Sequence, residues 1–219
     1  MDVVKIFQQR YSTKAYDADQ KIPAQQFAQL LELLRLTPSS INIQAWHFMI
    51  AAQPSAKQRI AKALVGKYAY NAPKVLNASH SIVFCTKTDI DTAHLNAILT
   101  QESQDGRFKD QDTQDKQQAS REGYVQHYRH AQGDISRWTE NQTFIALGQL
   151  LTATALLEID ATPIGGFDAH ILSDELNLAQ QGLKPSVIVA LGYRADSDFN
   201  AQLPKSRLPA EQIFSQIET

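Results

Sequence analysis

The longest apolar run in the chain is the feature that most limits how it can fold. Residues 144–157 (FIALGQLLTATALL) contain Gln149 and two threonines but no charged residue. A helix that spans a bilayer needs about 20 apolar residues, so this run is too short for that purpose. Because apolar side chains occupy all sides of a helix drawn through the run, it predicts a buried helix that other elements surround. Asp134 precedes that helix and marks its start.

Apolar periodicity predicts further helices, and short β-branched runs predict a few strands. One helix starts at residues 3–7, a second opens with Pro23 in its first turn, and a third is capped by Ser55 and runs to Leu64. Strands are predicted at residues 46–51, 81–86, 186–191 and, as a short piece, 162–164. Short strands among long helical segments indicate a three-layer α+β or α/β domain.

The composition narrows the class of protein. Lys and Arg number 21 against 23 Asp and Glu, which excludes a nucleic-acid or membrane-surface binder driven by net charge. The single cysteine, Cys85, excludes a disulfide framework and is expected to be an inert small hydrophobe. No signal-peptide core is visible, so we expect a cytoplasmic protein. We expect one domain over residues 1–219, with a polar, exposed excursion around residues 101–133.

Common catalytic motifs are absent from the sequence. It has neither GxGxxG nor GxxxxGK[ST] for nucleotide phosphates, and neither HExxH nor GxSxG for hydrolytic chemistry. His127 and His130 are three residues apart, but a third ligand has no obvious source, so no metal site is predicted. Catalysis by side chains alone therefore has no visible apparatus.

Three short polar clusters stand out instead, at residues 10–14 (RYSTK), 37–46 (TPSSINIQAW) and 203–207 (LPKSR). The first and the third each pair two cations around a hydroxyl group, which suits a phosphate held by charge-assisted hydrogen bonds. The alternative is a set of solvated surface charges. Short basic motifs match by chance so often that any one cluster alone favours this alternative.

The order of these clusters along the chain, with Asn71, Lys74, GFD at 166–168 and DFN at 198–200, resembles the nitroreductase family. The resemblance covers essentially the whole chain and is closest to the NAD(P)H nitroreductases, flavin reductases and dihydropteridine reductases. It implies an α+β three-layer fold with a central, mostly antiparallel sheet flanked by helices. It also implies an intertwined homodimer that binds FMN at the interface between the two chains.

The resemblance implies a cofactor-binding role for residues from all three clusters. Arg10, Lys205 and Arg207 would hold the FMN phosphate, with Ser12 on the same side, and residues 38–42 would come from the partner chain. The implied cofactor-binding residues are Arg10, Tyr11, Ser12, Lys14, Pro38, Ser39, Ser40, Asn42, Asn71, Lys74, Pro163, Ile164, Gly165, Gly166, Lys205 and Arg207.

Residues at the flavin ring are implied to tune the cofactor rather than to act as acids or bases. Lys14 and Lys74 would face the N1/O2 edge, where reduced flavin is anionic, and a cation there stabilises that charge. Asn71 would bond to the pyrimidine edge. Gly165 and Gly166 would pass under the ring, with a backbone N–H near N5.

The implied activity is hydride transfer from NAD(P)H to flavin N5, followed by transfer of two electrons to a nitroaromatic or quinone. One open face serving both substrates requires a ping-pong sequence, and the cofactor supplies the redox chemistry. A flavin reductase or a dihydropteridine reductase would use the same site. A protein of another class, a non-catalytic dimeric binding protein, would be colourless and would take up no FMN.

The side chains implied to meet the substrate are Ile41, Tyr68, Tyr70, Tyr124 and Phe199. For Tyr68, ordinary packing is an equally good interpretation. Gly165 stands where the family usually has glutamate, and Tyr124 where it has phenylalanine. Ile41 replaces a threonine and Tyr11 a histidine, so these positions bear on substrate preference.

Overall fold

The computed structural model describes residues 2–217, and its centre is one antiparallel sheet. The strands are β1 (Trp46–Ala51), β2 (His80–Lys87), β3 (Asp160–Ile164) and β4 (Leu183–Gly192), in the spatial order β1-β2-β4-β3. The central strands β2 and β4 bury long apolar runs, and Ile82 lies opposite Val189. Such strands need cover on both faces of the sheet.

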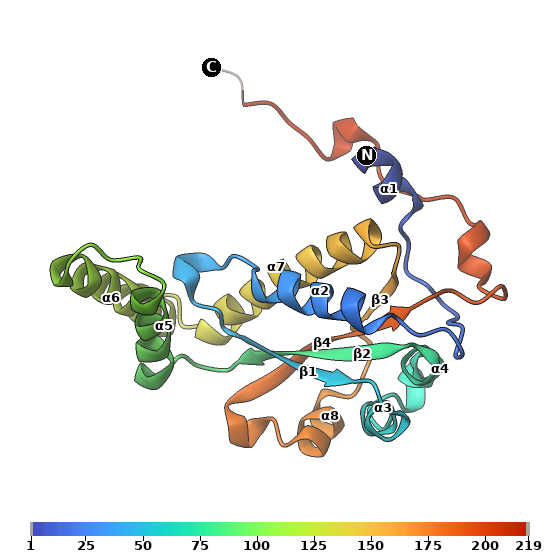
Figure 1. Cartoon of the computed structure of the whole chain (residues 1–219), viewed down its shortest axis with the longest axis horizontal. Coiled ribbons are helices and arrows are strands. Elements are labelled where there is room, and N and C mark those ends of the chain that lie inside the picture. The colour runs from blue at the N-terminus through green and yellow to red at the C-terminus, as the bar shows by residue number, and fades with distance from the viewer. Residues whose placement is uncertain (1, 218–219) are drawn as a thin grey trace.

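Helices supply that cover in two layers (Figure 1). Helices α2 and α7 pack on one face, and α3, α4 and α8 pack on the other, which confirms the predicted three-layer α+β fold. The helices are α1 (Val3–Gln9), α2 (Ala24–Arg35), α3 (Pro54–Ala61), α4 (Ala72–Asn77), α5 (Thr92–Gln104), α6 (Gln111–Gln126), α7 (Ile135–Leu156) and α8 (Ala169–Leu176).

The long apolar run forms most of α7, as predicted, and Asp134 caps the helix by accepting a hydrogen bond from the backbone N–H of Arg137. Ala146 and Leu150 on its inner side are buried in the core. On its outer side, however, Phe144 and Ile145 are 47% and 45% exposed. The expectation of a helix surrounded on all sides is therefore wrong for a single chain.

Several predicted element boundaries are also wrong. Helix α3 begins at Pro54, one residue before the predicted cap Ser55, and ends at Ala61, because the last turn before Leu64 tightens to i→i+3 hydrogen bonds. Pro23 precedes α2 instead of lying in its first turn. The predicted strand at 46–51 matches β1, whereas the other three are each longer than predicted.

The polar excursion is mostly exposed and helical, and it forms the end of α5, all of α6 and a π-helical turn at His127–Ala131. Its inner side buries Val125 together with the charged residues Glu102 and Arg121. A buried ion pair leaves no apolar periodicity in the sequence. Sequence patterns therefore gave no indication that one side of these two helices is buried. Between residues 2 and 217, no helix is long and apolar enough to cross a membrane.

Cys85 lies in the interior of β2 and is fully buried. Burial raises the pKa of its thiol to about 12, because the apolar surroundings disfavour the thiolate. The thiol is therefore unreactive at neutral pH, and the prediction of an inert hydrophobe is confirmed.

Candidate functional site

A cavity of about 940 Å³ lies between an N-terminal segment, within residues 6–12, and a C-terminal segment, within residues 200–207. Its walls come from α1 and the residues that follow it, from the end of α7, from β3 and from residues 200–207. Arg10, Lys205 and Arg207 all line this cavity, together with Tyr11 and Ser12. The structure thus brings together the first and third polar clusters, which nearly two hundred residues of sequence separate.

Asp160 on the cavity wall is paired with Arg194, whereas Arg10, Lys205 and Arg207 form no ion pair with a carboxylate within residues 2–217. The Nη1 atom of Arg10 is buried and has no hydrogen-bond partner in the described part of the chain. Burial, and then the charge of Arg207, lower the pKa of Arg10; burial, Arg10 and Arg207 lower that of Lys205. Lys205 reaches across the cavity to donate to the Arg10 carbonyl. A phosphate group would supply the missing acceptor and relieve this repulsion, so the residues present fit such a group.

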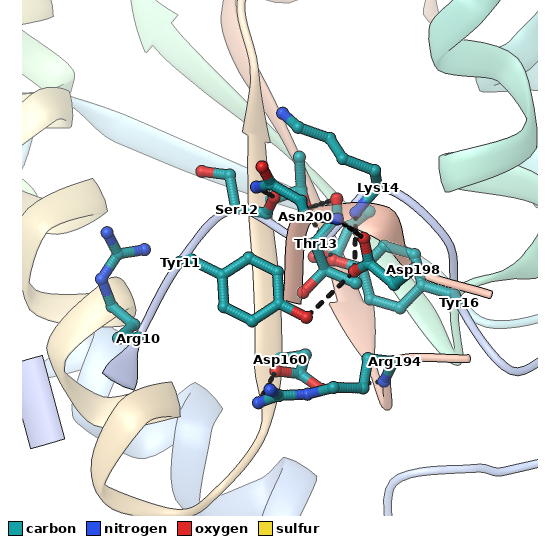
Figure 2. A network of polar contacts seen from close by, with 12 residues as sticks. Arg10, Tyr11, Ser12, Thr13, Lys14, Tyr16, Asp160, Arg194, Asp198 and Asn200 are labelled. Atoms are coloured by element: carbon teal, nitrogen blue, oxygen red, sulfur yellow. Dashed lines mark hydrogen bonds and ion pairs between the residues drawn. The ribbon is translucent and has the colours of Figure 1, made fainter. Parts of the chain in front are cut away.

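The backbone of residues 11–14 is fixed by Asp198 (Figure 2). One carboxylate oxygen of Asp198 accepts from the Tyr11 hydroxyl and from the Lys14 N–H, each at 3.1 Å. The other accepts from the N–H of Asn200 at 3.0 Å, and the Asn200 amide donates to the Ser12 carbonyl at 2.9 Å. Figure 2 shows the Arg10 and Lys14 side chains pointing away from this network, so it holds the backbone at Ser12 and Lys14 and leaves both charges available.

Tyr11 is held from its other side by Arg194, whose guanidinium carbon lies 4.9 Å from the centre of the tyrosine ring. Arg194 in turn donates to both carboxylate oxygens of Asp160 at the start of β3. Burial, and then the hydrogen bond to Asp198, raise the pKa of the Tyr11 hydroxyl to about 12. The sequence carried Asp198 in the DFN motif but no sign of this role.

A second group of predicted residues meets beside α4. The ammonium group of Lys74 donates to the Asn71 side-chain oxygen at 2.6 Å, and the Asn71 amide donates to the Gly166 carbonyl at 2.9 Å. A Cβ atom on Gly166 would lie 3.1 Å from both Asn71 and Tyr68, so glycine permits this close approach. Burial, and then the charge of Lys14, lower the pKa of Lys74. A buried cation of this kind favours a negative charge beside it.

The residues around that group differ in exposure. Gly165 is exposed, whereas the side chain of Ile164 is buried in the core, so only the backbone of Ile164 can face a ligand. Tyr70 and Phe199 are each 67% exposed, and the Tyr70 ring lies 4.6 Å from the Lys74 ammonium. Tyr124 is also exposed, on α6. Pro163 is half-buried in β3.

The third group, the segment Pro38, Ser39, Ser40, Ile41 and Asn42, does not line the cavity. Its hydrogen bonds run to α5, α6 and α7; the Ser40 N–H, for example, donates to Gln142 at 2.8 Å. The predicted site residues therefore form three separate groups within one chain. Glu102, Arg121 and Gln142, which hold the third group, gave no signal in the sequence.

Titration of Tyr11 gives the first test of this geometry. The pKa of about 12 lies above the value of about 10 for an unfolded tyrosine. The folded state thus favours the neutral hydroxyl; the resulting stability is complete below about pH 10 and is lost as the pH rises towards 12. The free energy of unfolding should fall more steeply across this window in the parent than in Tyr11→Phe. Equal slopes in denaturant titrations would contradict the assignment.

Comparison with known proteins places this geometry in a family. The model of the Nitroreductase family matches residues 7–193. The oxygen-insensitive NAD(P)H nitroreductase of Salmonella typhimurium is 39% identical over 217 residues, covering 99% of this chain and 100% of the relative. The major NAD(P)H-flavin oxidoreductase of Aliivibrio fischeri is 32% identical and covers 97% of each chain.

The fold comparison agrees with the sequence comparison. A nitroreductase-like protein of Exiguobacterium sibiricum in complex with FMN superimposes with a TM-score of 0.82, over 99% of this chain and 98% of its own. At 22% identity this similarity shows a shared fold. Since the family model spans most of the sequence and relatives match it end to end, the chain belongs to the nitroreductase family.

Proposed function

We propose that the protein is an FMN-dependent NAD(P)H oxidoreductase that reduces nitroaromatics or quinones. The observation that carries the proposal is the cavity wall of Arg10, Lys205 and Arg207, where a buried nitrogen of Arg10 has no acceptor within the described residues 2–217. The names of the Salmonella and Aliivibrio relatives support the reductant and the reaction class. The Aliivibrio relative's name favours free flavin as a second candidate acceptor.

Each residue group has a distinct part in this proposal. Arg10, Lys205 and Arg207 bind the phosphate of FMN, and Ser12 lies on the same wall. FMN bound there would supply the redox chemistry that couples oxidation of NAD(P)H to two-electron reduction of the acceptor, and one open face for both substrates would require a ping-pong sequence. Lys74, with Lys14 nearby, stabilises negative charge at the ring, because a buried ammonium group that has no carboxylate partner among residues 2–217 favours an adjacent anion.

Loss of a phosphate contact tests the cofactor assignment. A charge-assisted hydrogen bond contributes about 1.5–3 kcal/mol. Arg207→Ala should therefore raise the dissociation constant of FMN by roughly tenfold to a hundredfold. Arg59→Ala, which removes an exposed arginine paired with Glu175, serves as the control and should bind FMN like the parent.

The measurement is a fluorescence titration of apoprotein with FMN. A parent protein that is colourless and takes up no FMN would exclude the oxidoreductase and favour a binding protein. Arg207→Ala with parental affinity would instead exclude the cavity as the phosphate site. A panel of nitroaromatic, quinone, flavin and dihydropteridine acceptors with both nicotinamide nucleotides then separates the alternative substrates.

We also propose that the functional unit is a homodimer. The outer side of α7 exposes Phe144 and Ile145, and the C-terminal segment exposes Leu208 and Phe214, which are 66% and 74% accessible. Figure 1 shows this segment running out past α1, away from the body of the chain. Apolar surfaces of this kind at a helix and an extended arm are typical of subunit interfaces.

A charge placed on α7 tests the dimer. Ile145→Asp should give a monomer with much weaker FMN binding, because a buried unpaired carboxylate opposes association. Ile171→Asp on α8 is the matched control: it is also a helical isoleucine, 37% exposed, but it lies on the opposite layer. Sedimentation should show the parent and Ile171→Asp as dimers. A parent protein that is monomeric with FMN bound would contradict the homodimer proposal.

Gly165 gives a prediction about the redox potential. A Cβ atom at Gly165 would meet no atom within 4 Å, and its backbone is outside the left-handed region, so a side chain fits without strain. A glutamate there would repel a flavin that becomes anionic on reduction. At an assumed separation of about 6 Å the repulsion is roughly 0.7–2.8 kcal/mol, or about 15–60 mV for two electrons.

Gly165→Glu should accordingly make the midpoint potential of bound FMN more negative by that amount. Gly165→Gln controls for size and should leave the potential near the parental value. The measurement is a redox titration of each variant with FMN bound. An unchanged or raised potential in Gly165→Glu would refute the electrostatic argument.

A further inference from the structure

The loop between α2 and β1 has a backbone conformation that its residues do not favour. Ile41, Asn42 and Gln44 have φ angles of 48°, 56° and 46°. Non-glycine residues are uncommon in this left-handed region, and a β-branched residue such as Ile41 is a clear outlier. Strained backbones of this kind persist only where the surrounding structure holds them, and they cluster at binding sites.

One buried ion pair holds the two strained residues at the centre of this loop. Glu102 of α5 accepts from the Asn42 amide at 2.9 Å through one oxygen and from Arg121 at 2.7 Å through the other. Arg121 of α6 also donates through Nε to the Ile41 carbonyl at 3.2 Å. The Arg121 and Glu102 side chains are 0% and 3% exposed, so water does not compete for these contacts.

The Glu102–Arg121 ion pair is better suited to holding the loop than to stabilising the fold. Apolar residues of similar volume often replace a buried ion pair with no loss of stability. The Nη1 atom of Arg121 is buried without a partner among the described residues, so the pair is not optimised for stability. Apolar residues could fill this space, but they could not accept from Asn42 or donate to the Ile41 carbonyl.

From this geometry we infer that Glu102 and Arg121 are positioning residues, which hold the loop at residues 38–42 in the form that completes the flavin site of a second copy of the chain. The inference rests on the proposed function and on the proposed homodimer, because the loop does not line the cavity of its own chain. It gives a role to the polar excursion, which carries both charges on adjacent helices. Without the pair, the loop relaxes from its left-handed conformation and must be reordered at every binding event.

The double variant Glu102→Leu/Arg121→Met tests this role. It removes both charges together, so no unpaired charge is left in the interior. We expect a melting temperature close to that of the parent, but a dissociation constant for FMN at least tenfold higher, because two anchoring bonds to charged groups are lost. The circular dichroism of bound flavin should also change, since this signal reports the surroundings of the ring.

Glu140→Leu/Lys184→Met is the matched control. This ion pair spans 3.0 Å between α7 and β4, is about one-third exposed and makes no bond to the loop. It should keep the parental FMN affinity and dichroism. Arg121→Lys is a second variant that keeps the buried charge paired but loses the planar guanidinium fork. It should also bind FMN more weakly, and it covers the case in which the double variant does not fold.

A mixed dimer tests whether the loop acts on the flavin site of its own subunit or on that of the neighbouring subunit. When one subunit carries Arg207→Ala and the other carries the double variant, both defects fall on the same flavin site if the loop acts across the interface. The other site is then intact, and half of the sites bind FMN with parental affinity. If the loop serves its own subunit, each site has one defect and none binds normally.

These experiments distinguish a failure of the positioning role from a failure of the proposed function. A parent that takes up no FMN removes the proposed function. A parent that binds FMN normally, with a folded double variant or Arg121→Lys of parental affinity, overturns the positioning role alone. A mixed dimer in which no site keeps parental affinity overturns the action on the second copy.

Discussion

The pairing of β2 with β4 is the interaction on which the rest of the structure depends. These two central strands are buried on both faces, and their register sets where each covering helix and each edge segment can lie. Tyr16 donates to the Ala190 carbonyl of β4 at 2.9 Å, and Thr162 of β3 donates to the Thr13 carbonyl. The segment that carries Arg10 and Lys14 is therefore fixed to the sheet, and the cavity at its edge is a consequence of the central pairing.

At two places in this chain, positive charges that are partly removed from water lie close together and lower the stability of the folded state. Arg10 and Lys205 are partly desolvated beside Arg207, which costs stability because burial and like charges both disfavour the cationic forms. Lys74 is buried near Lys14, and within residues 2–217 only the Asn71 side-chain oxygen accepts from it. Charged groups whose pKa values are shifted by burial and by specific neighbours cluster at functional sites. The two clusters would meet opposite ends of one elongated anionic cofactor, with phosphate at the first and the flavin ring at the second.

The sequence predicted the layers for reasons that are local, and its polar clusters contain the residues that line the cavity at Arg10–Ser12 and 203–207. The strand at 46–51 and the capped helix after Asp134 follow from residue patterns that the chain itself displays. Asp198 and Glu102 could not be found in this way, because their roles depend on partners far along the chain and a buried carboxylate has no periodic signature. Resemblance named the loop at 38–42, but only the structure shows which helices hold it.

The proposed homodimer would account together for three features that look like defects in one chain. The outer side of α7 is apolar and exposed, the C-terminal segment runs out past α1, and the loop at 38–42 is strained yet makes its bonds away from the cavity. Each has a cost for an isolated chain, in exposed apolar area or in backbone energy. A second copy of the chain would bury the helix and the arm and would present a cavity for the loop to complete. Binding and assembly would then stabilise each other, since ligand and partner both favour the same ordered state.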